Sequence, residues 1–142
     1  MNKKKRVLFF CKHNSCRSQM AEAWLKHITP DQFEVFSAGL HPEPIHPLVD
    51  VVMQEIGISI SGQTSKSIDM YLGKQGFDWI IIVCPEGEAE CPKLYPFALN
   101  IERWPLSDPA SLEGSKEQVL ETFRRIRDQI KERIEQWLLM NK

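Results

Sequence analysis

Residues 7–18, VLFFCKHNSCRS, decide the fold of this chain. An apolar run ends at Cys11, and after Ser18 apolar residues recur at helical spacing, at Met20, Ala21, Trp24, Leu25 and Ile28. A strand that ends in a thiol and leads through a short loop into a helix forms a cradle for an anion, because loop N–H groups and the helix dipole converge on it. The same field favours the thiolate of Cys11 over its thiol. The stretch therefore predicts a nucleophile at the mouth of an anion site.

The residues around Cys11 supply the other groups that such a site needs. Arg17 follows Cys11 after five intervening residues and can clamp a tetrahedral oxyanion with two parallel N–H bonds. Ser18 can donate a hydrogen bond to the thiolate. A buried apolar cysteine beside a surface arginine would give the same spacing, but the strand–loop–helix context and Ser18 favour the functional interpretation. The expected oxyanion-binding residues are Lys12, His13, Asn14, Ser15, Cys16, Arg17 and Ser18.

Length and composition narrow the class of protein. The 142 residues are enough for one domain, which we expect to span 1–142, and no run approaches the roughly 20 apolar residues of a membrane span. A net charge of −1 gives no electrostatic footprint for nucleic acid. Four cysteines without an export signal indicate a reducing cytoplasm, where thiols are more often catalytic or metal-binding than structural. We therefore expect a cytoplasmic protein without nucleic-acid or membrane partners.

Apolar runs alternate with helical patterns along the whole chain. Strands are predicted at 6–10, Phe33–Gly39, 77–83 and 97–104. Helices are predicted at 17–28, from Pro47 to a stop at Gly57, from a cap at Thr64 or Ser65 to Leu72, and after a capping box of Ser115 with Gln118. Strands that alternate with helices predict an α/β fold, a parallel sheet with helices on both faces. Ligands of such sheets bind beyond the carboxyl ends of the strands.

The last predicted helix carries an apolar stripe in steps of three and four residues. The stripe consists of Val119, Phe123, Ile126, Ile130, Ile134 and Trp137. The charges on its outer side are mixed, so the stripe is expected to pack in the core rather than to bind a partner.

Two further cysteines lie at a distance from the first loop. Cys11 ends the first predicted strand and Cys84 ends the third. If the two strands are neighbours, they lie about 4.8 Å apart, close to the 4.4–6.8 Å that a disulfide needs between α-carbons. Cys91 follows seven positions after Cys84, and Pro85 and Gly87 between them make the segment mobile.

Three interpretations of these cysteines stay open at this point. They can form a structural pair of buried cysteines. Zinc could bind Cys11, His13 and Cys16, but it would occupy the anion cradle, and the chain has no Cys-x2-Cys pair. In a thiol relay, Cys84 attacks the sulfur of a modified Cys11, and Cys91 then attacks the sulfur of Cys84.

A general acid is predicted after the fourth strand. Asp108 should lie at the carboxyl edge of the sheet, where it can protonate an oxygen that the thiolate displaces. The alternative is that Asp108 and Pro109 merely start a turn.

The pattern Cys11-x4-Cys16-Arg17-Ser18 with a late Asp108-Pro109 resembles the low-molecular-weight protein tyrosine phosphatase fold, and Cys84 and Cys91 resemble those of the thioredoxin-coupled arsenate reductases built on it. The likeness extends over nearly the whole chain and includes residues 14–22, 37–39, 63–65 and 108–110. It implies a three-layer sandwich with a four-stranded parallel sheet in the order 2-1-3-4. It also implies a monomer without a cofactor, with arsenate as substrate and thioredoxin as reductant.

The resemblance further implies a reaction. Cys11 attacks arsenate held by Arg17 and the loop, while Asp108 protonates the departing oxygen. Cys84 then attacks Cys11, arsenite leaves, and Cys91 converts the Cys11–Cys84 disulfide into Cys84–Cys91 as residues 84–91 loop out. Thioredoxin restores the thiols, although a glutaredoxin or mycothiol route stays open. Cys16 matches a second loop cysteine with a structural role.

Two positions depart from the family's pattern. His13 replaces a common glycine, so that a loop amide is turned differently or a ring covers the anion. Lys66 replaces an acidic ligand that some relatives offer to a potassium ion, and the other ligands match Asn14, Glu22 and Ser37. We therefore expect no metal, and hypothesise that the lysine ammonium takes the place of the potassium ion.

Two other functions remain as alternatives. A phosphatase for phosphotyrosine or a small phosphoester would use the same Cys11, Arg17 and Asp108, although Ser107, Ala110 and Ser111 offer no aromatic grip for a substrate ring. A redox sensor would use only Cys84 and Cys91, and would leave the first loop without a purpose.

Overall fold

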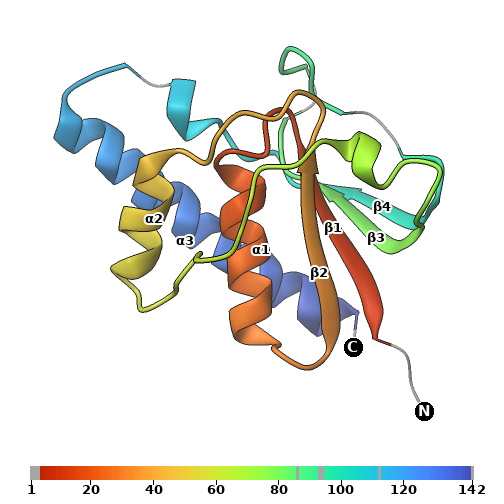
Figure 1. The fold of residues 1–142 in the computed structure, drawn as a ribbon. Coiled ribbons are helices and arrows are strands. Elements are labelled where there is room, and N and C mark those ends of the chain that lie inside the picture. The colour runs from red at the N-terminus through yellow and green to blue at the C-terminus, as the bar shows by residue number, and fades with distance from the viewer. Residues whose placement is uncertain (1–3, 86, 93–94, 112, 142) are drawn as a thin grey trace.

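The computed structural model describes residues 4–85, 87–92, 95–111 and 113–141. Its strands are β1 (Lys5–Cys11), β2 (Phe33–Gly39), β3 (Phe77–Ile82) and β4 (Ala98–Arg103). They form one parallel sheet in the order β2-β1-β3-β4 (Figure 1). Strand β1 pairs along its whole length with β2, and its residues 7–10 also pair with β3. The predicted α/β class and strand order are confirmed.

The helices are α1 (Arg17–Ile28), α2 (Pro47–Gln54) and α3 (Lys116–Met140), with 3-10 turns η1 (Ile68–Met70) and η2 (Pro109–Ser111). Side chains of all three α-helices pack in one apolar cluster with Val7 and Phe9 of β1. The predicted stripe of α3 is confirmed, because its residues from Phe123 to Trp137 are buried there. The predicted capping box of Ser115 and Gln118 is also present.

The other face of the sheet is covered by the 3-10 turn η1 and by side chains from connecting segments. Leu8 and Phe10 of β1 pack there with Ile68 of η1, Tyr71 and Tyr95. Tyr71 and Tyr95 each pack edge-on against Phe77 of β3, with ring centroids 5.5 and 5.6 Å apart. Because β1 is covered on both faces, its run of residues 7–10 is buried without alternation, as expected for the inner strand of a parallel sheet.

The helix predicted between Thr64 or Ser65 and Leu72 is mostly absent. Its cap is Ser67, whose side chain accepts a hydrogen bond from Asp69 N, and only the three residues of η1 are helical. The physical reason is that Lys66 is bound on both sides: its N–H donates to Asn14, and its carbonyl accepts from Gly39 N. These bonds hold the segment extended up to Ser67. Helix α2 likewise ends at Gln54, before the predicted stop at Gly57.

The parallel arrangement places one end of the sheet at the start of α1. The loop after β1, the segment after β3 and the segment after β4 all leave the sheet at this end (Figure 1). Within the described part of the chain, no helix is both long enough and apolar enough to cross a bilayer.

The α3 stripe should carry much of the folding free energy. Ile134 is fully buried on it, whereas its neighbour Glu135 is exposed. We predict that Ile134→Ala lowers the free energy of unfolding by about 2–5 kcal/mol, because it removes buried methyl groups and leaves a cavity. Glu135→Ala, with similar helix propensity, should change it by less than about 0.5 kcal/mol. Urea denaturation of both variants measures the difference, and a loss equal in the two would contradict the packing described here.

Candidate active site

The loop between β1 and α1 is held by its carbonyl groups. Amides of residues 40–46 donate to consecutive parts of the loop: Leu40 to Cys11 O (3.2 Å), His41 to Lys12 O (2.8 Å), Glu43 to His13 O (3.0 Å) and His46 to Ser15 O (3.1 Å). The described residues contain no cis peptide bond. In a trans peptide the N–H points opposite to the preceding carbonyl, so these bonds turn the N–H groups of Lys12, His13, Asn14 and Cys16 to the other side. That side is where Asn14 N lies 3.3 Å from the Cys11 sulfur.

Asn14 shapes the centre of the loop. It is fully buried and has a φ of 52°, a left-handed conformation that Asn tolerates better than most residues. Its Oδ1 accepts from Gln19 Nε2 (2.9 Å) and from Lys66 N (2.8 Å), and its Nδ2 donates to Ser18 Oγ (2.7 Å). The side chain thus ties the loop to α1 and to the segment before η1.

Cys11 lies at the carboxyl end of β1 with its sulfur 3.0 Å from Ser18 Oγ. Because Ser18 Oγ accepts from the Asn14 amide, its own hydrogen is available to the sulfur, as predicted. A cavity of about 230 Å³ is lined by Cys11, Arg17 and the predicted acid Asp108, together with His13 and Cys16. The structure therefore brings the predicted nucleophile, clamp and acid to one cavity.

The side chain of Arg17 is buried and makes three hydrogen bonds through its two Nη atoms. Its Nη1 donates to Leu106 O (3.0 Å), and both Nη atoms donate to the carboxylate of Glu88, at 2.9 and 3.0 Å. Burial lowers the pKa of the Arg17 guanidinium, but the hydrogen bonds to Glu88 and the electrostatic attraction to Cys11, Glu88 and Asp108 outweigh it, so the net direction is upward. Glu88 was not predicted as a site residue. The available signal was the row of carboxylates between Cys84 and Cys91, together with an arginine that was predicted to bind anions.

Cys16 differs from Cys11 in its protonation. Burial raises the pKa of the Cys16 thiol to about 12, although Ser15 Oγ, 3.4 Å from the sulfur, acts in the opposite direction. Cys16 is therefore a thiol at neutral pH, which favours a structural role over a nucleophilic one.

Cys84 and Cys91 form a disulfide, with 6.2 Å between their α-carbons, and Cys11 and Cys16 are free. Strands β1 and β3 are neighbours, as the sequence suggested, but Phe10 pairs with Ile82 and Val83 N donates to Phe10 O. Cys84 therefore lies one residue beyond the level of Cys11 and packs on the opposite face of the sheet, with Phe10 and Tyr95. The structure brings Cys84 to Cys91 and leaves Cys11 in the cluster of the α-helices.

Arg103, at the end of β4, holds this disulfide segment. Its Nη1 lies 2.8 Å from the Cys91 sulfur and donates to Cys84 O (3.1 Å), and its Nη2 donates to Pro92 O (2.9 Å). Sequence analysis did not identify Arg103, because only the pairing of β3 with β4 brings it beside the cysteines.

His13 and Lys66, the two residues that depart from the family's pattern, have well-defined hydrogen-bond partners. The ring of His13 lines the cavity, and its Nδ1 donates to His41 O (2.8 Å). The ammonium of Lys66 donates to Thr64 O (2.6 Å) and Ser37 Oγ (3.4 Å) and lies 3.9 Å from Glu22. Burial lowers the pKa of Lys66, and the Glu22 carboxylate partly offsets this. In the described ranges, no cluster of three or more His, Cys, Asp or Glu side chains could hold a metal ion.

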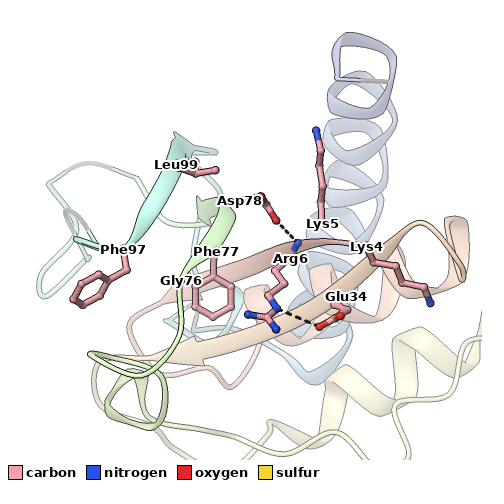
Figure 2. A pocket seen from close by; sticks show the side chains of 9 residues that line it. All are labelled: Lys4, Lys5, Arg6, Glu34, Gly76, Phe77, Asp78, Phe97 and Leu99. Carbon is pink, nitrogen blue, oxygen red and sulfur yellow. Dashed lines mark hydrogen bonds and ion pairs between the residues drawn. The ribbon is translucent and has the colours of Figure 1, made fainter. Parts of the chain in front are cut away.

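A larger cavity, of about 790 Å³, lies at the other end of the sheet (Figure 2). Its lining includes residues 4–6 around the start of β1, Phe97 just before β4, and Leu99 within β4. Arg6 is already occupied, since its N–H donates to Asp78 (2.7 Å) and its guanidinium lies 3.4 Å from Glu34. The predicted nucleophile and acid line the smaller cavity, which is therefore the candidate active site.

Comparison with known proteins agrees with this geometry. The chain matches the low molecular weight phosphotyrosine protein phosphatase family over residues 6–142. An arsenate reductase of Shouchella clausii (strain KSM-K16) is 41% identical over 134 residues, covering 94% of this chain and 95% of the relative.

Solved structures give the same picture. An arsenate reductase in the phosphate binding state has a TM-score of 0.81 at 38% identity, covering 97% of this chain and 99% of that chain. A thioredoxin-dependent arsenate reductase of Corynebacterium glutamicum has a TM-score of 0.66 at 30% identity, covering 99% of this chain and 65% of that one.

Gly39 limits the position of the anion loop. A β-carbon at Gly39 would lie 2.8 Å from Asn14 N and from His13 C, so the loop backbone would have to move. We predict that Gly39→Ala weakens the binding of inorganic phosphate at least about tenfold, because the loop amides lose their convergence. In the control Gly62→Ala, the added carbon meets nothing within 4 Å, although a φ of +89° strains it. That variant should lose stability but keep phosphate affinity in calorimetric titrations. Equal affinity in both variants would refute the steric argument.

The Lys66 ammonium should make potassium unnecessary. We predict that the melting temperature of the protein is the same in KCl and NaCl of equal ionic strength. Lys66→Met removes this ammonium and leaves Glu22 with the half-exposed Lys26 as its remaining cation, so oxygen atoms of Glu22 and Ser37 can face a monovalent ion and the variant should be more stable in KCl than in NaCl. Thermal unfolding in both salts measures this. Potassium-specific stabilisation of the unsubstituted protein would refute the substitution of the ion by Lys66.

Proposed function

The chain belongs to the low-molecular-weight phosphotyrosine protein phosphatase family, and we propose that it acts there as a thioredoxin-dependent arsenate reductase. The observation that carries this proposal is the pairing of an anion cavity lined by Cys11, Arg17 and Asp108 with two further cysteines, Cys84 and Cys91, that form a disulfide. The likeness to arsenate reductases over most of the chain supports it.

The first step joins arsenate to Cys11. The loop amides and Arg17 hold the tetrahedral oxyanion, and Ser18 steadies the thiolate by a hydrogen bond. The Cys11 sulfur attacks arsenic and forms a sulfur–arsenic bond, while one arsenic–oxygen bond breaks. Asp108, half-buried at the cavity, gives its proton to the departing oxygen, which leaves as water.

The second step reduces the arsenic. The Cys84 thiolate attacks the Cys11 sulfur, and the sulfur–arsenic bond breaks with its electron pair remaining on arsenic. Arsenate arsenic thereby gains two electrons and leaves as arsenite, and the two cysteine sulfurs, oxidised by two electrons, form a disulfide.

The third step transfers the disulfide outward. The Cys91 thiolate attacks the Cys84 sulfur, and Cys11 leaves as a thiolate. The resulting Cys84–Cys91 bond is the one present in the structure, so we assign the structure to the oxidised stage of the cycle. A thioredoxin dithiol then reduces it. The thioredoxin-dependent neighbour from Corynebacterium glutamicum supports this choice of reductant.

The cycle requires residues 84–91 to rearrange, because Cys84 and Cys11 occupy opposite faces of the sheet in this structure. The described residues of this segment include two left-handed positions, Gly87 (φ 96°) and Glu90 (φ 60°), where the backbone direction changes sharply. Arg103 anchors both ends of the segment. Its guanidinium also lies 2.8 Å from the Cys91 sulfur, so a cation stands beside the group that attacks in the third step.

A phosphatase is the second candidate, because phosphate has the shape and charge of arsenate. Two observations make it weaker as the main function. Ala110 and Ser111 line the cavity beside Asp108 without an aromatic ring, and Trp104 is fully buried, so it cannot grip a phenyl group. A phosphatase also has no use for Cys84 and Cys91.

The proposal places the protein in the cytoplasm as a monomer. Cys11 must stay reduced between cycles, which the reducing cytoplasm ensures. A redox sensor would not depend on Cys11. Its Cys11→Ser variant would keep the redox response of Cys84 and Cys91, and neither form would turn over arsenate.

Cys91→Ser separates the relay from its alternatives. We predict that this variant completes a single turnover of arsenate and then stops, because the Cys11–Cys84 disulfide has no resolving thiol. The measurement is NADPH consumption coupled to thioredoxin and thioredoxin reductase, with arsenite quantified and disulfides mapped by mass spectrometry.

Ser107→Ala, at an exposed position after β4, removes no proposed reacting group, so it serves as the control and should retain multiple turnover. Unchanged steady-state turnover in Cys91→Ser would reject the relay. Phosphoester hydrolysis without any arsenate-dependent NADPH consumption would instead favour the phosphatase.

A further inference from the structure

The contact between Arg17 and Glu88 has a chemistry that the relay does not use. Two Nη atoms of a buried arginine face two carboxylate oxygens, at 2.9 and 3.0 Å. The side chains are only 4% and 21% exposed, so water screens the pair weakly. This geometry is the one by which a guanidinium binds two oxygens of a tetrahedral oxyanion.

We propose that Glu88 is an internal anion that takes Arg17 when the Cys84–Cys91 disulfide closes, and thereby expels oxyanions from the oxidised protein. The inference rests on the proposed function for its place in the cycle. Its physical content, competition between one carboxylate and one oxyanion for one arginine, does not depend on arsenate reduction.

The disulfide is what fixes Glu88 at this place. The carboxylate lies inside a loop closed by the sulfurs of Cys84 and Cys91, which are seven positions apart. Within the loop, Glu88 N donates to Pro85 O (3.2 Å) and Cys91 N donates to Glu88 O (3.1 Å). A short closed loop has few conformations, so the carboxylate is held near Arg17 at a high effective concentration.

A second carboxylate of the disulfide loop, Glu90, contacts residues on the opposite side of the anion cradle. Glu90 lies 3.5 Å from the ammonium of Lys12 and 3.9 Å from His41 Nε2. Unlike Glu88, the Glu90 side chain is 56% exposed and faces Lys12 and His41 at the rim of the cradle. Glu90 therefore supplies a matched control, with the same charge, the same loop and no contact with Arg17.

The consequence is a difference between the two redox states. An oxyanion that enters the oxidised protein must break two charge-assisted hydrogen bonds, or share Arg17 with a carboxylate that repels it. In the reduced protein the loop is open, and Arg17 is released for the substrate. Arsenate is thus excluded while Cys84 is oxidised, when its adduct on Cys11 would have no thiol to attack it.

The test uses inorganic phosphate and no turnover. Isothermal titration compares the protein with the Cys84–Cys91 disulfide closed and the fully reduced protein, with the thiol state verified by mass spectrometry. We expect phosphate to bind the oxidised form at least about tenfold more weakly, within the usual range of coupling between sites. Glu88→Gln should bring the two forms to within about threefold, because it removes the competing charge, whereas Glu90→Gln should keep the full difference.

The linkage gives an independent readout. If phosphate binds the reduced form tenfold more tightly, saturating phosphate must raise the reduction potential of the disulfide by about 30 mV, the value for a tenfold change in a two-electron couple. Glu88→Gln should abolish this shift. Equal phosphate affinity in both redox states of the unsubstituted protein, or an undiminished difference in Glu88→Gln, would overturn the proposal. Because neither readout needs arsenate, a protein that fails to reduce arsenate can still pass both.

Discussion

The left-handed turn at Asn14 is the constraint on which the site depends. Its side chain bonds to Gln19 and Ser18 of α1 and to the backbone of Lys66, and its own N–H faces the Cys11 sulfur. One buried amide therefore joins the end of β1, the first turn of α1 and the segment that leads to η1. Because the outward carbonyls are bound by residues 40–46, the loop amides have one direction left, toward the anion. The proposed anion site is thus shaped by the protein itself.

The sheet explains both the proximity and the separation of the cysteines. Parallel pairing of β1 with β3 delivers Cys11 and Cys84 to the same edge. The pleat alternates side chains between two faces, so an offset of one residue is enough to place Cys84 in the other layer. The relay must therefore change the backbone of residues 84–91, and a rotation of side chains is not sufficient. The same segment carries Glu88 and Glu90, so its rearrangement also changes the charge that surrounds Arg17.

Local signals in the sequence predicted most of the fold. The strand Phe33–Gly39, the start of α1 at Arg17 and the capping box at Ser115 follow from short-range patterns and agree with the structure. The short helix after Thr64 was wrong, because tertiary bonds from Asn14 and Gly39 override its local preference. The partner of Glu88 and the layer of Cys84 depend on register and on loop closure, which no short window of sequence encodes. Asn14 was identified as an anion ligand, but its role in shaping the turn depends on contacts with Gln19 and Lys66.

Arg103 has a consequence for the speed of the proposed cycle. Two of its three contacts in the segment are with the backbone oxygens of Cys84 and Pro92, and these do not depend on the state of the sulfurs. When thioredoxin reduces the disulfide, the Arg103 guanidinium on β4 can keep its hydrogen bonds to both ends of the segment. The residues between Cys84 and Pro92 are then fixed at both ends, so they have few conformations to sample. The swing of this segment between the two layers is then comparable to the opening of a lid, on the microsecond-to-second scale, and does not require the unfolding of the domain.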